Sequence, residues 1–285
     1  MHKERNSFSG WLSASLYGHL SLWKSSIRTI LMAIFILLMT YMLVRSMGNS
    51  VSVSRFDVHL GETVFAYANT GFNMIMTSVA LMVMMSELPK RVSYQNYAVM
   101  RLSRGKWLIS LVVFCIVIVF VFVALMLTAS AFFSASFVTP GNGWSDLERL
   151  AVDESYAYEM QFVSEYIRVL SPVAACVLAS FVLYLFWLTM TLLILLFSLW
   201  EMPNFGVIFC ISLLLLNITI LFESLPGIKL PSHFATLGAI ASQVEKNKFQ
   251  YVVKVVCVYF LLDALLLALM VGRVKHMDIR FIEKE

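Results

Sequence analysis

The chain is poor in the residues from which catalytic and metal sites are usually built. Its four cysteines stand alone, with no Cys-x-x-Cys pair and no Cys/His cluster, so the sequence offers no zinc site or disulfide framework. It contains neither a His-Glu-x-x-His nor a Gly-x-Ser-x-Gly motif. Its one Gly-Lys pair, Gly105-Lys106, is followed by Trp107, so a phosphate-binding loop is missing as well. These absences argue against an enzyme and predict no metal, cofactor or catalytic residue in this chain.

Charged residues are also scarce, and the chain instead contains long apolar runs. Only 13% of the residues are charged and 60% are hydrophobic, which is more apolar surface than a soluble domain of 285 residues buries. Each of the apolar runs is about long enough to cross the roughly 30 Å hydrocarbon core of a bilayer. They cover residues 29–47, 66–86, 107–133, 169–199, 205–222 and 251–272. We therefore expect an all-α, polytopic membrane protein with six spans and a single transmembrane domain over residues 1–285.

The distribution of charge predicts the topology. The net charge is +4, but the basic residues lie at the edges of the apolar runs, which is typical of contact with a lipid bilayer and not with nucleic acid. The segment Ser86–Trp107 carries five Lys and Arg against one Glu, whereas the connection near 134–168 is acidic. Because Lys and Arg favour the cytoplasmic side, we expect both termini to be cytoplasmic.

Two segments outside the spans are predicted to touch the membrane. Residues 8–26 place Trp11, Leu12, Leu16, Leu20 and Trp23 at helical spacing, which favours an interfacial helix, although a disordered tail is the alternative. Residues 222–248 are apolar but interrupted by two prolines and a glycine, which favours a re-entrant segment before the last span over a plain surface loop. Between the fourth and fifth spans, Pro203 and Asn204 predict a tight helical hairpin.

The basic connection has helix signals of its own. Ser93 is a candidate N-cap, and Tyr94, Tyr97, Met100 and Leu102 can share one face of a short helix. We expect a short helix over roughly residues 93–103. A purely topological role would explain its charges, but it would not require an amphipathic helix with two tyrosines between them.

These features resemble the membrane subunits of ABC-2 (type V) exporters, in particular small Gram-positive members. The six spans, the interfacial helix, the cytoplasmic termini and the sequence SELPKRVSYQNYAVMRLSRGKW are similar to that family. The resemblance implies that residues 93–104, which we call the coupling segment, contact a separate ATPase. The residues of this contact would be Tyr94, Tyr97, Arg101 and Arg104. It further implies two ATPase copies that bind ATP and Mg²⁺, a second identical or related six-span subunit, and a location in the bacterial plasma membrane.

Few ionisable or polar residues lie inside the spans. Asp263 is the carboxylate placed well inside the last span, where it needs a partner such as Ser212, Asn217 or Thr219 of the fifth span, or an Asp of a sister subunit. Asn73 and Thr77 lie one turn apart in the second span. Each of these residues could line a transport path or hold helices together, and the sequence leaves both interpretations open.

The sequence favours one function and leaves two alternatives open. The favoured interpretation is an export permease that moves a peptide or lipid-like substrate outward with energy from a partner ATPase. An ion-coupled secondary transporter would use Asp263 instead. A non-transporting immunity or scaffold protein could bind a cationic peptide through the acidic connection near 146–165, which is otherwise an ordinary solvated loop.

Overall fold

The chain folds as a bundle of helices. The computed structural model describes residues 12–13, 15–20, 26–54, 58–69, 71–86, 103–139, 141, 143–145, 170–221 and 248–276. Within these ranges there is no strand, only an isolated bridge between His59 and Thr139, so the all-α prediction is confirmed. The helices are α2 (Ile27–Ser54), α3 (Leu60–Asn69), α4 (Gly71–Met85), α6 (Arg104–Ser134), α9 (Pro172–Leu199), α10 (Pro203–Leu221) and α12 (Lys248–His276).

Four helices in the described ranges are long and apolar enough to cross a membrane. They are Ile27–Ser46 within α2, Arg104–Ser134, Pro172–Leu199 and Val252–His276. They match four of the expected spans, at 29–47, 107–133, 169–199 and 251–272. The other two expected spans correspond to the shorter apolar helices Met74–Met85 and Pro203–Leu215. The long apolar helices mark the chain as a membrane protein.

The stretch expected to form the second span, residues 66–86, is not one helix. It falls in two helices, α3, which ends at Asn69, and α4, which begins at Gly71. Asn and Gly are weak helix formers, which suits the end of one helix and the start of another. Helix α3 also begins earlier than expected, at Leu60, because Glu62 stabilises its first turn.

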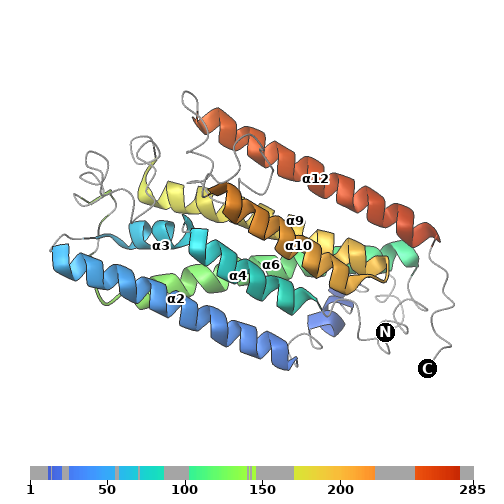
Figure 1. Cartoon of the computed structure of the whole chain (residues 1–285), viewed down its shortest axis with the longest axis horizontal. Helices are drawn as coiled ribbons and strands as arrows, with labels where there is room; N and C mark the ends of the chain where they lie inside the picture. Colours follow the sequence, from blue (N-terminus) through green and yellow to red (C-terminus); the bar gives the residue numbers. More distant parts are fainter. Residues whose placement is uncertain are drawn as a thin grey trace, which may run out of the picture.

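The helices alternate in direction along the bundle. The start of α2, the end of α4, the start of α6 and the ends of α9 and α12 all lie at one end, on the right in Figure 1. We call this the basic end, because its described residues include Arg28, Arg104, Lys106, Arg273 and Lys275. The start of α3 lies at the other end, which we call the Glu62 end.

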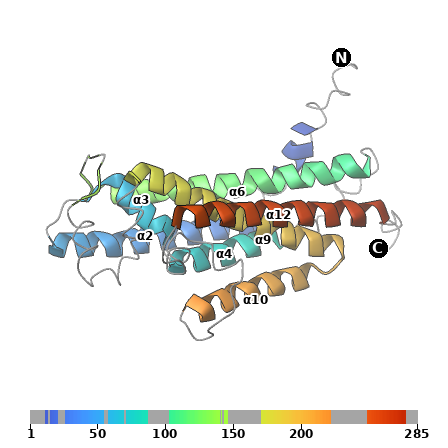
Figure 2. The ribbon, with the colours of Figure 1, turned by 90° about the horizontal axis from the view of Figure 1, so that it is seen from above.

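Helix α9 forms the centre of the bundle. It contacts α3, α4, α6, α10 and α12, and most of its side chains are buried. Its Trp187 is fully buried and packs edge to face against Phe122 of α6, with the ring centroids 4.9 Å apart. Helix α2 packs on the outside against α6 and α4, and α10 lies to one side of the bundle in Figure 2.

The connection between α9 and α10 is a tight hairpin, as predicted. Helix α9 ends at Leu199, Glu201 turns the chain with a φ of 65°, and α10 begins at Pro203. Proline suits the first position of a helix because that position needs no backbone donor. The Phe197 ring then packs against Phe205 of α10, with centroids 5.1 Å apart, which fixes the two helices side by side.

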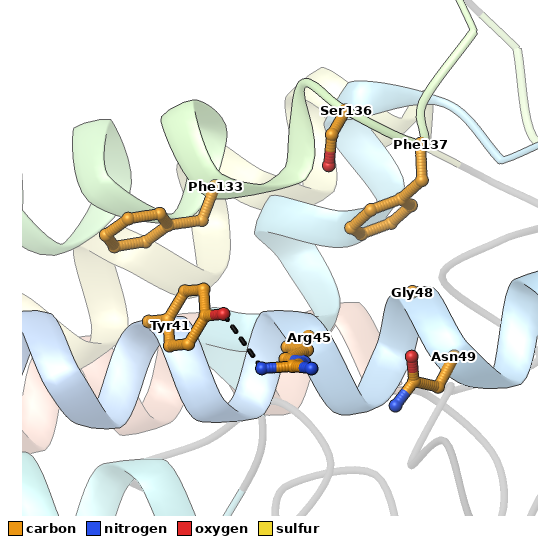
Figure 3. Close-up of a pocket in the computed structure, with 7 residues that line it drawn as sticks. All are labelled: Tyr41, Arg45, Gly48, Asn49, Phe133, Ser136 and Phe137. Carbon is orange, nitrogen blue, oxygen red and sulfur yellow. Dashed lines mark hydrogen bonds between the residues drawn. The ribbon is translucent and has the colours of Figure 1, made fainter.

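The outer faces of the bundle are apolar. Helix α2 exposes a row of aliphatic side chains at helical spacing, among them Ile30, Ile34, Leu38 and Met42. Helices α6 and α12 expose further large apolar residues, including Phe120, Phe132, Leu261 and Leu265. Such continuous apolar surface is unfavourable in water and suits a lipid environment. Between α2 and α6, the Tyr41 ring meets the edge of Phe133 with centroids 5.5 Å apart (Figure 3).

The expected interfacial helix at 8–26 is described only at residues 12–13, 15–20 and 26. Residues 15–20 are helical and lie beside the first part of α6 (Figure 2). Leu16 and Leu20 pack against the core of the bundle, while Tyr17 is 75% exposed. His19 is buried against Phe114 of α6, with ring centroids 5.4 Å apart. Trp11 and Trp23 lie outside the described residues, as does most of the expected re-entrant segment.

Candidate functional site

The buried carboxylate of Asp263 is held by the central helix. Asp263 is 7% exposed, and its Oδ1 accepts a hydrogen bond of 2.7 Å from the Thr189 hydroxyl of α9. The same hydroxyl lies 3.0 Å from the Leu185 carbonyl of its own helix. A hydroxyl has one hydrogen and can donate to only one of these acceptors at a time. A proton on Asp263 lets both contacts be hydrogen bonds, from Asp263 to Thr189 and from Thr189 to Leu185.

One partner of Asp263 therefore lies on the fourth span. Of the partners expected on α10, Ser212 is exposed and donates to the Ile208 carbonyl of its own helix. The side chains of Asn217 and Thr219 lie outside the described part of α10. Tyr184 of α9 and Tyr259 of α12 also lie near the carboxylate. Asp263 thus joins α12 to the centre of the bundle.

The polar residues of α4 are also turned into the bundle. Thr77 is 1% exposed and donates to the Met74 carbonyl, and Ser78 is equally buried. The Ser78 hydroxyl donates to the same carbonyl and accepts a hydrogen bond of 2.9 Å from the Trp187 indole of α9. The side chain of Asn73 lies outside the described residues. This geometry joins α4 to α9, and it favours helix packing over a polar path.

The basic end carries the described members of the coupling segment, Ser103 and Arg104. Arg104, the first residue of α6, donates a hydrogen bond of 2.9 Å to the Lys275 carbonyl near the end of α12. Arg273 of α12 donates one of 3.3 Å to the Leu199 carbonyl that ends α9, and its guanidinium lies 3.9 Å from Glu201. Cations are favourable at these carbonyl-rich helix ends. Tyr94, Tyr97 and Arg101 lie outside the described residues.

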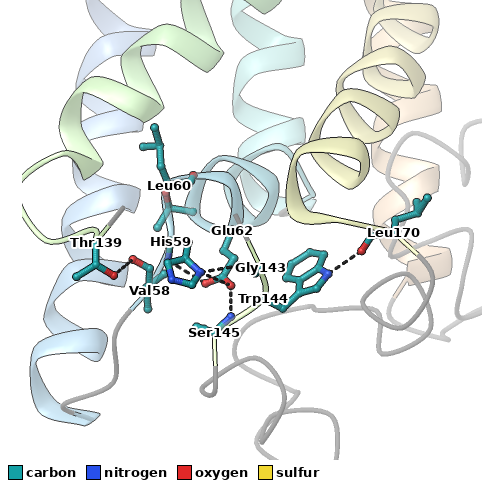
Figure 4. A network of polar contacts seen from close by, with 10 residues as sticks. Val58, His59, Leu60, Glu62, Thr139, Gly143, Trp144, Ser145 and Leu170 are labelled. Atoms are coloured by element: carbon teal, nitrogen blue, oxygen red, sulfur yellow. Dashed lines mark hydrogen bonds and ion pairs between the residues drawn. The ribbon is translucent and has the colours of Figure 1, made fainter. Parts of the chain in front are cut away.

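A second polar network closes the Glu62 end (Figure 4). Glu62 is fully buried and accepts a hydrogen bond of 3.0 Å from the His59 backbone, which caps the start of α3. Its other carboxylate oxygen accepts the backbone N–H of Ser145, from the connection that follows α6. The His59 ring lies 2.6 Å from the Gly143 carbonyl and 3.6 Å from Glu62. One side chain therefore ties α3 to a loop more than eighty residues away.

The same connection is held at two further points. The Thr139 backbone donates a hydrogen bond of 2.9 Å to the Val58 carbonyl. The Trp144 indole donates one of 2.7 Å to the Leu170 carbonyl just before α9, and its ring packs edge to face on Phe65 of α3. Gly141 packs so closely on the His59 ring that a Cβ at this position would collide with it. These contacts thus hold together the start of α3, the end of α6 and the start of α9.

Sequence reasoning missed this network. Glu62 is a charged residue at the start of an apolar stretch. It lies three residues after His59, where a capping glutamate is expected. The spacing was a usable signal, but histidine is not a typical cap, so the motif is easily overlooked. The acidic part of the connection, residues 146–169, lies outside the described residues.

Searches among known proteins give no relative for this chain: no family model, no curated protein and no solved structure matches it.

Proposed function

We propose that the chain is the membrane-spanning permease subunit of an ATP-driven exporter of the ABC-2 type. The contact that carries the proposal is the hydrogen bond from Arg104 to the Lys275 carbonyl. It places the end of the coupling segment on α12, whose Arg273 in turn holds the end of α9. A force on the coupling segment therefore reaches α6, α9 and α12 together, as the transmission of ATPase closure requires.

The proposed arrangement in the membrane has six crossings. Helices α3 and α4 together make the second crossing, and α10 makes the fifth. The basic end faces the cytoplasm, because Arg and Lys concentrate there. Both termini are then cytoplasmic, the connection near 134–168 is outside, and the segment 222–248 re-enters the outer leaflet. The alternating direction of the helices in Figure 1 supports this topology.

The energy source is proposed to be a partner. The sequence has no phosphate-binding loop of its own, so two copies of an ATPase subunit bind ATP and Mg²⁺. A second six-span subunit, identical or related, completes the two-fold assembly. The site for the ATPase comprises Tyr94, Tyr97, Arg101 and Arg104. The cargo is a peptide or lipid-like molecule moved outward through the bacterial plasma membrane.

Co-purification from the native membrane tests this proposal. A tagged chain is expected to retain an ATPase subunit, and Tyr97→Ala with Arg101→Ala is expected to reduce its yield severalfold. The matched control is Tyr17→Ala with Lys254→Ala, which removes an exposed tyrosine and an exposed cation outside the coupling segment and its contacts. The control should retain the ATPase. Equal retention in both variants, or no ATPase with the unaltered chain, would contradict the proposal.

A further inference from the structure

A cavity of about 240 Å³ opens between α2 and the end of α6, and neither the exporter proposal nor the bundle packing uses it. Helix α2 contributes Tyr41, Arg45, Gly48 and Asn49, which lie on one face, one or two turns apart. Helix α6 and the turn after it contribute Phe133, Ser136 and Phe137. Figure 3 shows the α2 residues on one side of the cavity and Phe133, Ser136 and Phe137 on the other.

Arg45 is the charge in this cavity. Its guanidinium donates a hydrogen bond of 3.0 Å to the Tyr41 hydroxyl and lies over the Tyr41 ring, 5.8 Å from the centroid. An Arg side chain carries five N–H donors, and in the described part of the chain this is the one hydrogen bond that Arg45 makes. The tyrosine therefore fixes the guanidinium at the cavity, while most of its donors stay available to a ligand.

The shape of the cavity depends on the absence of a side chain at Gly48. A Cβ on this residue would lie 2.9 Å from the Phe137 ring, which is closer than real Cβ contacts. The ring can therefore rest against α2 and form one wall. The Asn49 amide and the Ser136 hydroxyl add polar lining on the two sides.

The position of the cavity along α2 indicates its depth in the membrane. The apolar run of α2 is Ile27–Ser46, twenty residues long, or about 30 Å at 1.5 Å per residue. This length equals the hydrocarbon core of a bilayer, so Arg45 lies where that core meets the headgroups. Tyrosine and arginine both prefer this level. On the turns toward the bundle centre, Leu38, Met42 and Phe132 are 56%, 64% and 76% exposed.

We propose that this cavity binds the phosphate headgroup of an anionic phospholipid in the leaflet at the Glu62 end. The guanidinium and the hydroxyl and amide groups around it match the charge and acceptors of a phosphodiester. The exposed apolar side chains beside the cavity offer a surface for the acyl chains. A free phosphate shares the headgroup chemistry but makes no use of that apolar surface, so the lipid is the occupant.

Native mass spectrometry of the purified full chain tests the proposal. The protein is released from nanodiscs that contain phosphatidylcholine with a minor fraction of phosphatidylglycerol, and the retained lipids are counted. The unaltered chain is expected to retain phosphatidylglycerol preferentially. Arg45→Gln is expected to lower this retention about tenfold, the usual effect of losing a charge-assisted contact. The matched control is Lys254→Gln, which removes an exposed cation of α12 toward the same end.

Two further variants distinguish the contribution of the cavity to lipid retention from that of the Arg45 charge alone. Tyr41→Phe keeps the ring but releases the guanidinium, and Gly48→Ala displaces Phe137 while leaving Arg45 in place. Each is expected to lower phosphatidylglycerol retention severalfold with unchanged thermal stability. A reduction by Arg45→Gln without a reduction by Gly48→Ala would overturn the cavity as the binding site.

Soluble inorganic phosphate distinguishes the two sources of the headgroup. It is expected to leave phosphatidylglycerol retention unchanged, because it lacks acyl chains. Displacement of the lipid by inorganic phosphate at equal concentration would overturn the lipid assignment. Equal retention of phosphatidylcholine and phosphatidylglycerol, or equal effects of Arg45→Gln and Lys254→Gln, would also overturn it.

Discussion

The Thr189 hydroxyl on α9 joins the Asp263 carboxylate on α12 at 2.7 Å, and it also lies 3.0 Å from the Leu185 carbonyl. This relay connects the last helix to the most buried one. Asp263→Asn supplies an N–H donor in place of a carboxylic acid hydrogen, so Thr189 can still donate to Leu185. We therefore expect the Asp263→Asn variant to assemble and to function like the unaltered chain. Normal assembly of this variant without transport would instead favour an ion-coupled carrier.

Thr189→Val tests the same contact from the other side. Valine keeps the shape of threonine but removes the hydroxyl that hydrogen-bonds with Asp263, and we expect a loss of about 1 kcal/mol in stability, typical of hydrogen bonds between membrane helices. The measurement is thermal unfolding in detergent. Ser180→Ala is the matched control, because in the described part of the chain Ser180 bonds Cys176 of its own helix and not another helix. Equal losses in the two variants would show that the contact between α9 and α12 adds no stability.

Glu62→Gln is expected to loosen the connection after α6. Glu62 accepts two backbone N–H groups with its two oxygens, and an amide would present an N–H₂ group to one of these donors. An unsatisfied buried donor costs about 1–3 kcal/mol. Hydrogen exchange at residues 143–145 should accelerate accordingly. The control Glu201→Gln removes an exposed carboxylate at the basic end and should change stability by less than about 1 kcal/mol.

Acidification is expected to loosen the helix at residues 15–20. Burial lowers the pKa of His19 below its ordinary value of 6.5, so the unpacked helix binds more protons than the packed one. The packed form is then fully stable above pH 6.5, and its stability falls as the pH drops below that value. His19→Gln should remove this pH dependence.

Cysteine labelling measures this effect. In a chain without its native cysteines, Ser15→Cys creates a buried thiol and Tyr17→Cys an exposed one. The labelling rate of the buried thiol divided by that of the exposed thiol corrects for the intrinsic pH dependence of the reaction. It should rise below pH 6.5 in the unaltered background and stay constant with His19→Gln. A constant ratio in both backgrounds would show that His19 does not control this packing.

The topology is testable in intact cells. A single cysteine from Ser155→Cys, in the acidic connection, should react with an impermeant maleimide. Met202→Cys, in the exposed turn between α9 and α10 near the basic end, should react only after lysis. The opposite pattern would place the basic end outside.

The sequence predicted the helices well where composition alone decides them. The apolar runs around α6, α9 and α12 and the Pro203 hairpin were predicted almost at their observed bounds, because a long apolar helix satisfies all its backbone groups internally in lipid. The division of α3 from α4 was not predicted, since hydropathy averages over Asn69-Thr70-Gly71. The contact of Asp263 with Thr189 on α9 was not predicted, because hydropathy does not say which face of an apolar helix meets which neighbour.

The loop contacts at the Glu62 end were beyond prediction for a different reason. They join His59 and Glu62 to Gly143 and Ser145, across a whole span, and they use backbone groups that carry no sequence signal. The cavity at Arg45 likewise depends on the relative position of α2 and α6. Such features arise from packing between segments and not from the pattern within one.

The central position of α9 affects the order in which the bundle assembles during synthesis. Domains and their parts form from the N-terminus onward as the chain is made. When α9 enters the membrane, α3, α4 and α6 are already present, but α12 is not, so Thr189 faces lipid until residues 248–276 arrive. The bundle is therefore complete only when its last helix covers this surface. A chain that stops before α12 would leave Thr189 without the Asp263 contact and would leave this face of α9 uncovered.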